Sequence, residues 1–318
     1  MAYNYPVIDL APFITGGDAK KKEEVIEKLR EACSDYGFFV AVNHGIPDQI
    51  MDNTMDATIG FFNLDLEEKL KITTPPGAPL AAGYTKEPAK SEHWQMFTPA
   101  PINVFPANPP HFKETMEEMW WKLDEAAVLV QSLLNDCLRL PKGTLAKYND
   151  SRGTDILLGF HYLPATETEK TAVNAHRDNG LFTLVFENQV EGLEFLKDGD
   201  WIPIDPIPHS LVINVGDALQ ALSNDKMKSP THRILAQPGK SRYAFVYGYM
   251  VAEEKWVEPM PELIGQTNES PKFKKFNIKE HMALKQVFKN PPPHWNDVVG
   301  VHYHAIAPSV GATAVTTN

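Results

Sequence analysis

The second half of the chain holds a series of short apolar segments, and this series limits the fold more than any other feature. Gly, Asp, Asn and Pro residues separate the segments, and each segment is too short for a stable helix. Many short strands between such turns are typical of β-sandwiches and barrels. The segments are residues 156–162, 181–186, 193–195, 201–204, 210–215 and 243–251. We therefore expect a mainly β fold with a double-stranded β-helix core, a jelly roll of the cupin-like kind.

Helical patterns lie outside this series. Apolar residues recur at spacings of three and four in residues 18–36, 48–70 and 112–138, and the last of these carries a wide apolar stripe that should pack against a sheet. We therefore expect N-terminal and C-terminal α-helices to flank the core of a single domain. Its expected parts are a helix-rich region with a proline-rich substrate loop (1–150), the jelly-roll core (151–255), a C-terminal helix and lid (256–309) and a polar tail (310–318).

Three side chains in the strand-rich half have the pattern of a metal site. His176 and Asp178 are two residues apart, so in an extended chain they point to the same side. His232 begins another apolar segment. Two imidazoles and one carboxylate that leave coordination positions open suit a non-haem Fe(II) that performs oxygen chemistry. The pattern predicts that these three residues bind a metal.

A second signal lies near the N-terminus, where residues 36–47 read Tyr-Gly-Phe-Phe-Val-Ala-Val-Asn-His-Gly-Ile-Pro. With the metal-binding pattern, this segment resembles the Fe(II)/2-oxoglutarate-dependent dioxygenases. The similar branch includes isopenicillin N synthase, the plant flavonoid and gibberellin oxygenases and 1-aminocyclopropane-1-carboxylate oxidase, and the resemblance covers residues 5–290. It implies an oxidoreductase that uses Fe(II), 2-oxoglutarate and O2, with ascorbate as a candidate reductant. It also implies that His44 is structural.

Arg242 is the candidate anchor for the cosubstrate. It lies ten residues after His232, at the head of an apolar segment. A guanidinium can bind a carboxylate through two parallel hydrogen bonds, so we expect Arg242 to bind the distal carboxylate of 2-oxoglutarate.

The chain departs from the family pattern at two places beside this anchor. Residues 242–244 read Arg-Tyr-Ala where the family has Arg-x-Ser, and residues 161–164 read His-Tyr-Leu-Pro where plant members have Asn-Tyr-Tyr-Pro. Ala244 and Leu163 therefore lack a hydroxyl that could bond the cosubstrate. Each missing hydrogen bond to a charged group would weaken binding by about 1.5–3 kcal/mol unless His161 or Tyr162 replaces it.

Three functions fit these residues. The first is a 2-oxoglutarate-dependent oxygenase that hydroxylates, desaturates or cyclises a small organic molecule, in specialised metabolism. The second, suggested by Ala244 and Leu163, is an Fe(II) oxidase that does not use 2-oxoglutarate, as in isopenicillin N synthase. The third is a catalytically silent barrel that binds a small molecule, although such a barrel has no physical need for an open metal face.

The substrate pocket is expected to involve aromatic residues. Residues 83–96 lie in a long proline-rich connection, which is unusual unless it binds something. In the resembled family this stretch forms one wall of the pocket, and we expect the C-terminal residues 277–295 to form another. The candidate substrate contacts are Tyr84, Trp94, Met96, Phe245 and Tyr247.

Charge and composition indicate which kinds of binding partner and which cellular compartment to expect. The net charge of −11 disfavours nucleic acid, and no apolar run is long enough to span a membrane. The two cysteines, Cys33 and Cys137, indicate reduced thiols. We therefore expect a cytoplasmic monomer or weak homo-oligomer.

Overall fold

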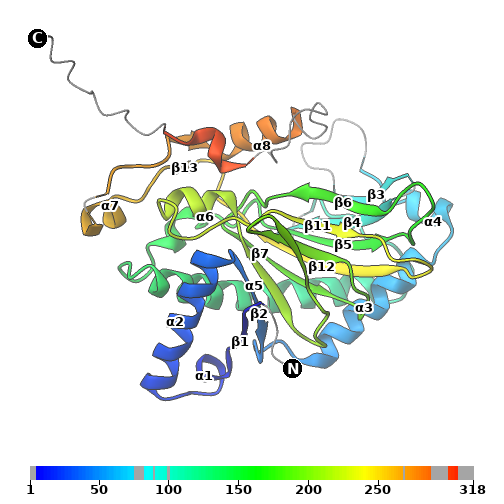
Figure 1. The fold of residues 1–318 in the computed structure, drawn as a ribbon. Coiled ribbons are helices and arrows are strands. Elements are labelled where there is room, and N and C mark those ends of the chain that lie inside the picture. Colours follow the sequence, from blue (N-terminus) through cyan, green and yellow to red (C-terminus); the bar gives the residue numbers. More distant parts are fainter. Residues whose placement is uncertain are drawn as a thin grey trace, which may run out of the picture.

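Two β-sheets lie face to face, and helices cover the outer side of the larger sheet (Figure 1). The computed structural model describes residues 5–74, 82–88, 90–98, 101–267, 269–287 and 300–306. Over these residues the two sheets form a jelly roll that is not closed into a barrel. The predicted fold class, a jelly-roll core with flanking helices, is confirmed.

The larger sheet has eight strands in the order β1-β2-β10-β7-β12-β5-β4-β3, and the smaller has four in the order β6-β11-β8-β9. Neighbouring strands are antiparallel except β1 and β2. The larger sheet contains β1 (Val7–Asp9), β2 (Phe38–Val42), β10 (Leu211–Val215), β7 (Phe182–Glu187), β12 (Arg242–Tyr249), β5 (Ile156–Tyr162), β4 (Ser91–Phe97) and β3 (Gly83–Glu87). The smaller contains β6 (Thr171–His176), β11 (His232–Leu235), β8 (Leu193–Lys197) and β9 (Asp200–Pro203).

Strands β3 and β4 correct one expectation. Residues 83–96 were predicted to belong to a proline-rich loop, but residues 83–97 form an antiparallel hairpin at the edge of the larger sheet. The prolines of this region stand before, between and after the two strands, so no strand residue lacks its N–H. Gly83 begins the hairpin with φ +87°, and a Cβ there would lie 1.9 Å from the carbonyl oxygen of Ile72.

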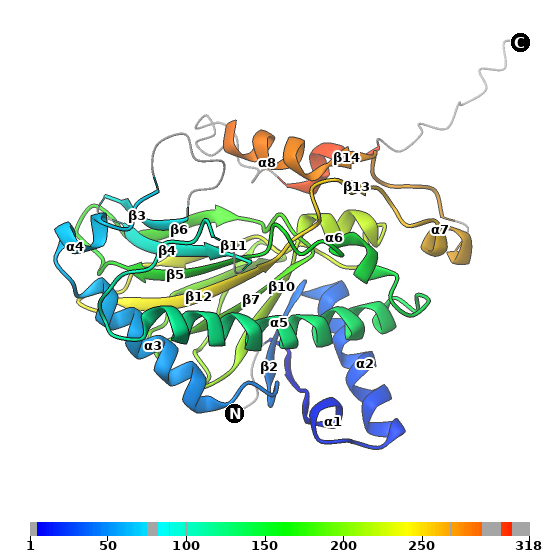
Figure 2. The same ribbon diagram turned by 180° about the vertical axis from the view of Figure 1, so that it is seen from behind.

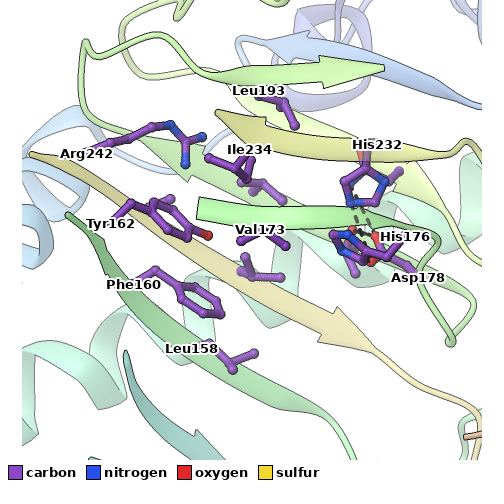
Figure 3. A pocket seen from close by; sticks show the side chains of 15 residues that line it. Leu158, Phe160, Tyr162, Val173, His176, Asp178, Leu193, His232, Ile234 and Arg242 are labelled. Carbon is purple, nitrogen blue, oxygen red and sulfur yellow. Dashed lines mark hydrogen bonds and ion pairs between the residues drawn. The ribbon is translucent and has the colours of Figure 1, made fainter. Parts of the chain in front are cut away.

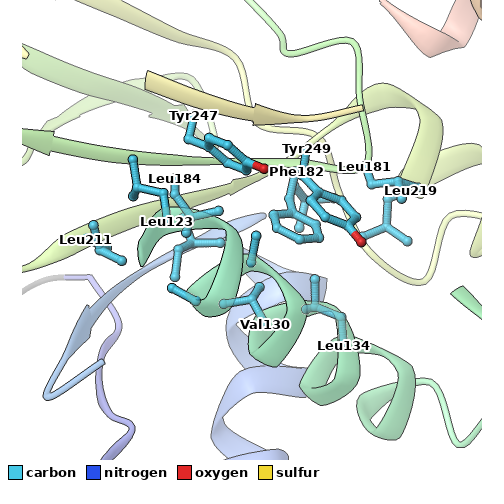
Figure 4. Close-up of a cluster of buried hydrophobic side chains, with 14 of the residues drawn as sticks. Leu123, Val130, Leu134, Leu181, Phe182, Leu184, Leu211, Leu219, Tyr247 and Tyr249 are labelled. Carbon is cyan, nitrogen blue, oxygen red and sulfur yellow. The ribbon is translucent and has the colours of Figure 1, made fainter. Parts of the chain in front are cut away.

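Three helices support the outer face of the larger sheet: α2 (Ala19–Asp35), α3 (Asp48–Phe62) and α5 (Phe112–Cys137). Figure 2 shows α5 running across the back of this sheet. Its apolar stripe, which includes Leu123, Val130 and Leu134, is buried against strand residues such as Leu184 and Tyr247 (Figure 4). The stripe predicted from the sequence therefore forms the centre of the main hydrophobic core.

The remaining elements are short, and α6, α7, β13 and α8 lie along one side of the molecule (Figure 1). No helix in the described ranges combines the length and the apolar character needed to cross a membrane. Cys33 and Cys137 are buried and free. The elements are α1 (Ala11–Ile14), α4 (Leu66–Leu70), η1 (Leu145–Tyr148), α6 (Asp217–Leu222), β13 (Trp256–Val257), α7 (Pro261–Thr267), β14 (Phe276–Asn277), α8 (Ile278–Val287) and η2 (Val301–His304).

The N-terminal signature packs β2 into the sheet. Gly37 has φ +78°, and a Cβ on it would lie 2.4 Å from the carbonyl oxygen of Lys228, so only glycine fits there. His44 is buried, and its Nε2 lies 2.9 Å from the carbonyl oxygen of His209. His44 therefore has the structural role expected for it.

The pleat of β12 gives its two faces different roles. Tyr243, Phe245 and Tyr247 belong to the core on the helix side. Arg242 and Ala244 point to the opposite side, between the two sheets. Successive side chains of a strand alternate in this way, so each pocket residue of β12 has a core residue as its neighbour.

Candidate metal centre

A cavity of about 140 Å³ lies between the two sheets. Figure 3 shows His176, Asp178 and His232 at one end of it and Arg242 at the other. The side chains between the two ends are mostly apolar. The lining residues are Leu158, Phe160, Tyr162, Val173, His176, Asp178, Thr183, Val185, Leu193, Asn214, His232, Ile234, Arg242, Ala244 and Val246.

Strand pairing brings the two histidines together. His176 ends β6, His232 begins β11, and the two residues are direct partners in the antiparallel ladder. Their ring centroids are 4.2 Å apart. Asp178 follows in the connection to β7, and its Oδ1 lies 3.8 Å from the Nε2 of each histidine. The ligand atoms of these three residues all lie within 4.8 Å of one another, so one ion could contact all three.

The backbone orients both imidazoles. Nδ1 of His176 lies 2.9 Å from the carbonyl oxygen of Asn174, and Nδ1 of His232 lies 3.2 Å from that of Pro230. Each Nδ1 therefore carries a proton and donates its hydrogen bond to a carbonyl, which directs each Nε2 at the common centre.

Asp178 is ionised and has one oxygen left for a metal. Its Oδ2 accepts hydrogen bonds from Thr183 Oγ1 at 2.7 Å and from Asn214 Nδ2 at 3.3 Å. Burial acts to raise the pKa of Asp178, but His232 and His176 outweigh it, and the pKa is lowered. Burial and the neighbouring His232 lower the pKa of His176 to about 4, so its ring is neutral at ordinary pH. A site with two imidazoles and one carboxylate fits a divalent cation.

Behind the turn that carries Asp178, the buried side chains of Asp217, His281 and Lys285 connect this turn to helix α8. The N–H of Asp217 donates to the carbonyl oxygen of Asp178 at 2.8 Å. The Asp217 carboxylate accepts from His281 at 3.0 Å and from Lys285 at 3.1 Å, and Lys285 also donates to the carbonyl oxygen of Arg177. Burial opposes ionisation of Asp217, but His281 and Lys285 lower its pKa to about 2. Helix α8 therefore fixes the turn that carries Asp178.

The C-terminal helix presents different residues from those expected. The predicted wall, residues 277–295, includes the apolar Met282 and Leu284, but Met282 is 36% exposed, whereas His281 is completely buried. Neither Met282 nor Leu284 lines the cavity between the sheets. Residues 288–295 of the predicted wall lie outside the described residues. Nothing in the sequence paired Asp217 with His281.

Arg242 lies in an unusual environment. Its side chain is 3% exposed and forms an ion pair with Glu187, whose side chain is 7% exposed. Burial lowers the pKa of Arg242, and the ring of Tyr162 lies 5.1 Å from its guanidinium carbon. Its Nη2 contacts Oε2 of Glu187, whereas Nε and Nη1 make no hydrogen bond that meets geometric criteria within the described structure. Buried donors without acceptors are rare, so these two nitrogens are suited to a further anionic group.

The aromatic residues expected to contact substrate lie elsewhere. Phe245 and Tyr247 are fully buried on the helix side of β12, and Trp94 and Tyr84 are buried in the same core. Met96 is buried there too, and none of the five lines the cavity. The structure thus places these residues in the core and not in the cavity, because aromatic content indicates burial without indicating which face of a strand is involved.

His161 and Tyr162, the two candidates to replace the missing hydroxyls, lie on opposite faces of β5. His161 faces the helices, where its Nδ1 lies 2.8 Å from Glu92 Oε1 and its Nε2 lies 3.0 Å from Ser241 Oγ. Tyr162, the next residue, lines the cavity beside Arg242. Burial raises the pKa of Tyr162 to about 12, so it is a neutral hydroxyl at ordinary pH. Of the two, only Tyr162 can therefore act in the pocket.

Comparisons with known proteins agree with this geometry. Residues 5–115 match the family described as non-haem dioxygenase in morphine synthesis N-terminal, and residues 153–250 match the 2OG-Fe(II) oxygenase superfamily. The chain is 30% identical over 291 residues to 2-oxoglutarate-dependent dioxygenase 19 of Oryza sativa subsp. japonica, covering 88% of this chain and 86% of that one. It is also 30% identical over 305 residues to 1-aminocyclopropane-1-carboxylate oxidase of Prunus mume, covering 91% and 92%.

A solved structure shows the same fold. The dioxygenase for auxin oxidation from rice superposes with a TM-score of 0.81 at 24% identity, covering 95% of this chain and 100% of that one. The chain belongs to the 2OG-Fe(II) oxygenase superfamily. It is a 2-oxoglutarate- and Fe(II)-dependent oxygenase, an oxidoreductase of a family that uses Fe(II), 2-oxoglutarate and O2.

We predict that His281→Ala destabilises the protein by about 2–3 kcal/mol, because the buried carboxylate of Asp217 loses one of its two side-chain partners. Urea unfolding measures the change. The matched control on the same helix is Met282→Ala, which removes a partly exposed side chain and should change the free energy of unfolding by no more than about 0.5 kcal/mol. Equal effects of the two substitutions would contradict the role given to the Asp217 group.

Proposed function

We propose that His176, Asp178 and His232 hold the Fe(II), that Arg242 binds the distal carboxylate of 2-oxoglutarate, and that the substrate is a small organic molecule. The observation that carries the proposal is the convergence of two Nε2 atoms and one carboxylate oxygen on a common centre. Within the described residues, no other His, Cys, Asp or Glu joins this group. Three protein ligands leave up to three positions of an octahedral ion open.

Iron and 2-oxoglutarate, when bound, supply the oxidative decarboxylation of the oxo acid by O2 that is coupled to oxidation of a C–H bond. The chain's own residues hold and orient these groups. Thr183 and Asn214 fix one oxygen of Asp178, so its other oxygen is directed at the centre. Val173, Leu193 and other apolar side chains exclude water from the space between the metal ligands and Arg242.

The position of Arg242 supports a dicarboxylic cosubstrate. It lies at the end of the cavity opposite the metal ligands (Figure 3), and its buried Nε and Nη1 make no hydrogen bond that meets geometric criteria among the described residues. A guanidinium fork can bind both oxygens of one carboxylate. A molecule with a 2-oxo acid group at one end and a carboxylate at the other matches both ends of the cavity.

The substrate takes the space that the cosubstrate leaves. Leu158, Phe160 and Val246 form an apolar wall in the cavity. We infer that a small molecule presents an apolar C–H group to this site and is hydroxylated, desaturated or cyclised there. The names of the relatives, which include an oxidase of 1-aminocyclopropane-1-carboxylate, support a small organic molecule as the substrate.

One observation favours a second function, an Fe(II) oxidase that does not use 2-oxoglutarate. Glu187 already neutralises Arg242, so this guanidinium has a carboxylate partner without any cosubstrate. Ala244 adds no hydroxyl to that end of the cavity. A direct test of cosubstrate use separates the two functions.

The first prediction concerns the metal. We predict that the purified protein binds one Fe(II) per chain, and that His176→Ala, Asp178→Ala and His232→Ala each abolish binding. Asp178→Glu should also fail, because its longer arm displaces the oxygen from a site with a tolerance of about half an ångström. Metal analysis after gel filtration measures the iron content, and His209→Ala, at a partly exposed histidine away from the cavity, is the control. Wild-type iron content in any one of the three alanine variants would contradict the assignment of these three residues as iron ligands.

The second prediction concerns the cosubstrate. We predict that the iron-loaded protein releases labelled CO2 from 2-oxoglutarate, slowly even without substrate. Arg242→Lys removes the bidentate fork and should raise the half-saturating 2-oxoglutarate concentration by roughly an order of magnitude or more, while iron binding is unchanged. Arg233→Lys is the matched control, because Arg233 pairs with Glu194 and does not line the cavity. Substrate turnover that persists after rigorous removal of 2-oxoglutarate would favour the oxidase.

A further inference from the structure

The carboxylate of Glu187 contacts Arg242, the residue at the cosubstrate end of the cavity, although Glu187 does not itself line the cavity. Glu187 ends β7 and is the direct ladder partner of Ala244 on β12. Residues of β7 that share its face, Thr183 and Val185, line the cavity, as Ala244 does. Glu187 therefore points between the sheets, toward the side chain with which it forms its ion pair, Arg242. It stands beside the small side chain of Ala244, where the family motif carries a hydroxyl.

Few ionisable groups lie near Glu187 among the described residues. Arg242 on β12 is its cation, and Tyr162 on β5 is neutral because burial raises its pKa to about 12. On the smaller sheet, β8 and β11 present the apolar Leu193 and Ile234 to this end of the cavity. Oε2 of Glu187 has no well-formed hydrogen bond among the described residues.

The other charged groups of the pocket are at its far end. His176, Asp178 and His232 lie opposite Arg242 (Figure 3). The cosubstrate end thus contains one guanidinium and one carboxylate in a poorly solvated space. A dicarboxylate that enters brings a second carboxylate to the same cation.

We propose that Glu187 is an internal counter-ion that competes with the distal carboxylate of 2-oxoglutarate for Arg242, and that Glu187 takes up a proton when the cosubstrate binds. The proposal rests on the proposed role of Arg242. Two carboxylates that share one site cannot both remain ionised at low cost, so one of them is protonated. A protonated Glu187 keeps its place and donates its O–H to the incoming carboxylate, which stays paired with Arg242. Glu187 is thereby a residue that sets cosubstrate specificity.

The sign of the pH dependence follows from this exchange. In the free protein Arg242 favours the ionised form of Glu187, whereas in the complex the second carboxylate favours the protonated form. Between the two corresponding pKa values, binding consumes a proton, so affinity for 2-oxoglutarate falls by up to about tenfold for each unit of rising pH. A 2-oxo acid without a distal carboxylate leaves the ion pair intact and shows no such fall.

Calorimetric titration tests the proposal. The Mn(II)-loaded protein, which keeps the metal ligands occupied without iron chemistry, is titrated with 2-oxoglutarate and with 2-oxobutyrate from about pH 6 to about pH 9, a range in which both ligands are fully ionised. Two buffers with different heats of ionisation give the number of protons taken up. The variants are Glu187→Gln and, as the matched control, Glu191→Gln, which removes an exposed carboxylate from the connection between β7 and β8.

We expect wild type and Glu191→Gln to take up as much as about one proton per 2-oxoglutarate, and to bind 2-oxobutyrate without this uptake. Glu187→Gln should take up none and should bind 2-oxoglutarate roughly tenfold or more tightly at the alkaline end, with 2-oxobutyrate affinity unchanged. Wild-type binding of 2-oxoglutarate with no proton uptake and no pH dependence would overturn the proposal, and this measurement does not depend on the folding of a variant. Failure of wild type to bind 2-oxoglutarate at every pH would instead overturn the role of Arg242, and the inference with it.

Discussion

The antiparallel pairing of β6 with β11 is the interaction on which the site depends. Because His232 stands directly opposite His176 in the ladder, two residues far apart in the sequence present their imidazoles to one point. Each ring is fixed by a carbonyl oxygen of its own segment, and the turn that carries Asp178 is held by the N–H of Asp217. The three potential ligands are therefore positioned by backbone hydrogen bonds, which suit a site with narrow geometric tolerance.

The pleat of the larger sheet lets the same strands provide both stability and chemistry. On β12, Phe245 and Tyr247 pack toward α5 and its neighbours, while Arg242 and Ala244 face the cavity. On β7, Glu187 shares the cavity side with Val185, and Phe186 between them faces the core. A substitution on the cavity face can therefore change which small molecule binds in the cavity without disturbing the aromatic core.

The sequence predicted those features that depend on spacing and alternation. The run of short apolar segments indicated the jelly roll, and the spacing of His176, Asp178, His232 and Arg242 placed them in one cavity, where the structure finds them. The faces of the aromatic residues could not be predicted, because Tyr247 is apolar enough for a core and polar enough for a pocket. Glu187 was missed for a similar reason: a glutamate that ends an apolar run has the pattern of a surface residue, and only the register with β12 reveals its partner.

The most direct test of the account is a crystal structure of the protein grown without O2 in the presence of Fe(II) and 2-oxoglutarate. The account predicts one metal ion at about 2.0–2.2 Å from Nε2 of His176, Nε2 of His232 and a carboxylate oxygen of Asp178, the usual range for such ligands. It predicts the 2-oxo acid group on that metal and the distal carboxylate on Arg242. A metal bound elsewhere, or a cosubstrate whose distal carboxylate lies away from Arg242, would contradict it.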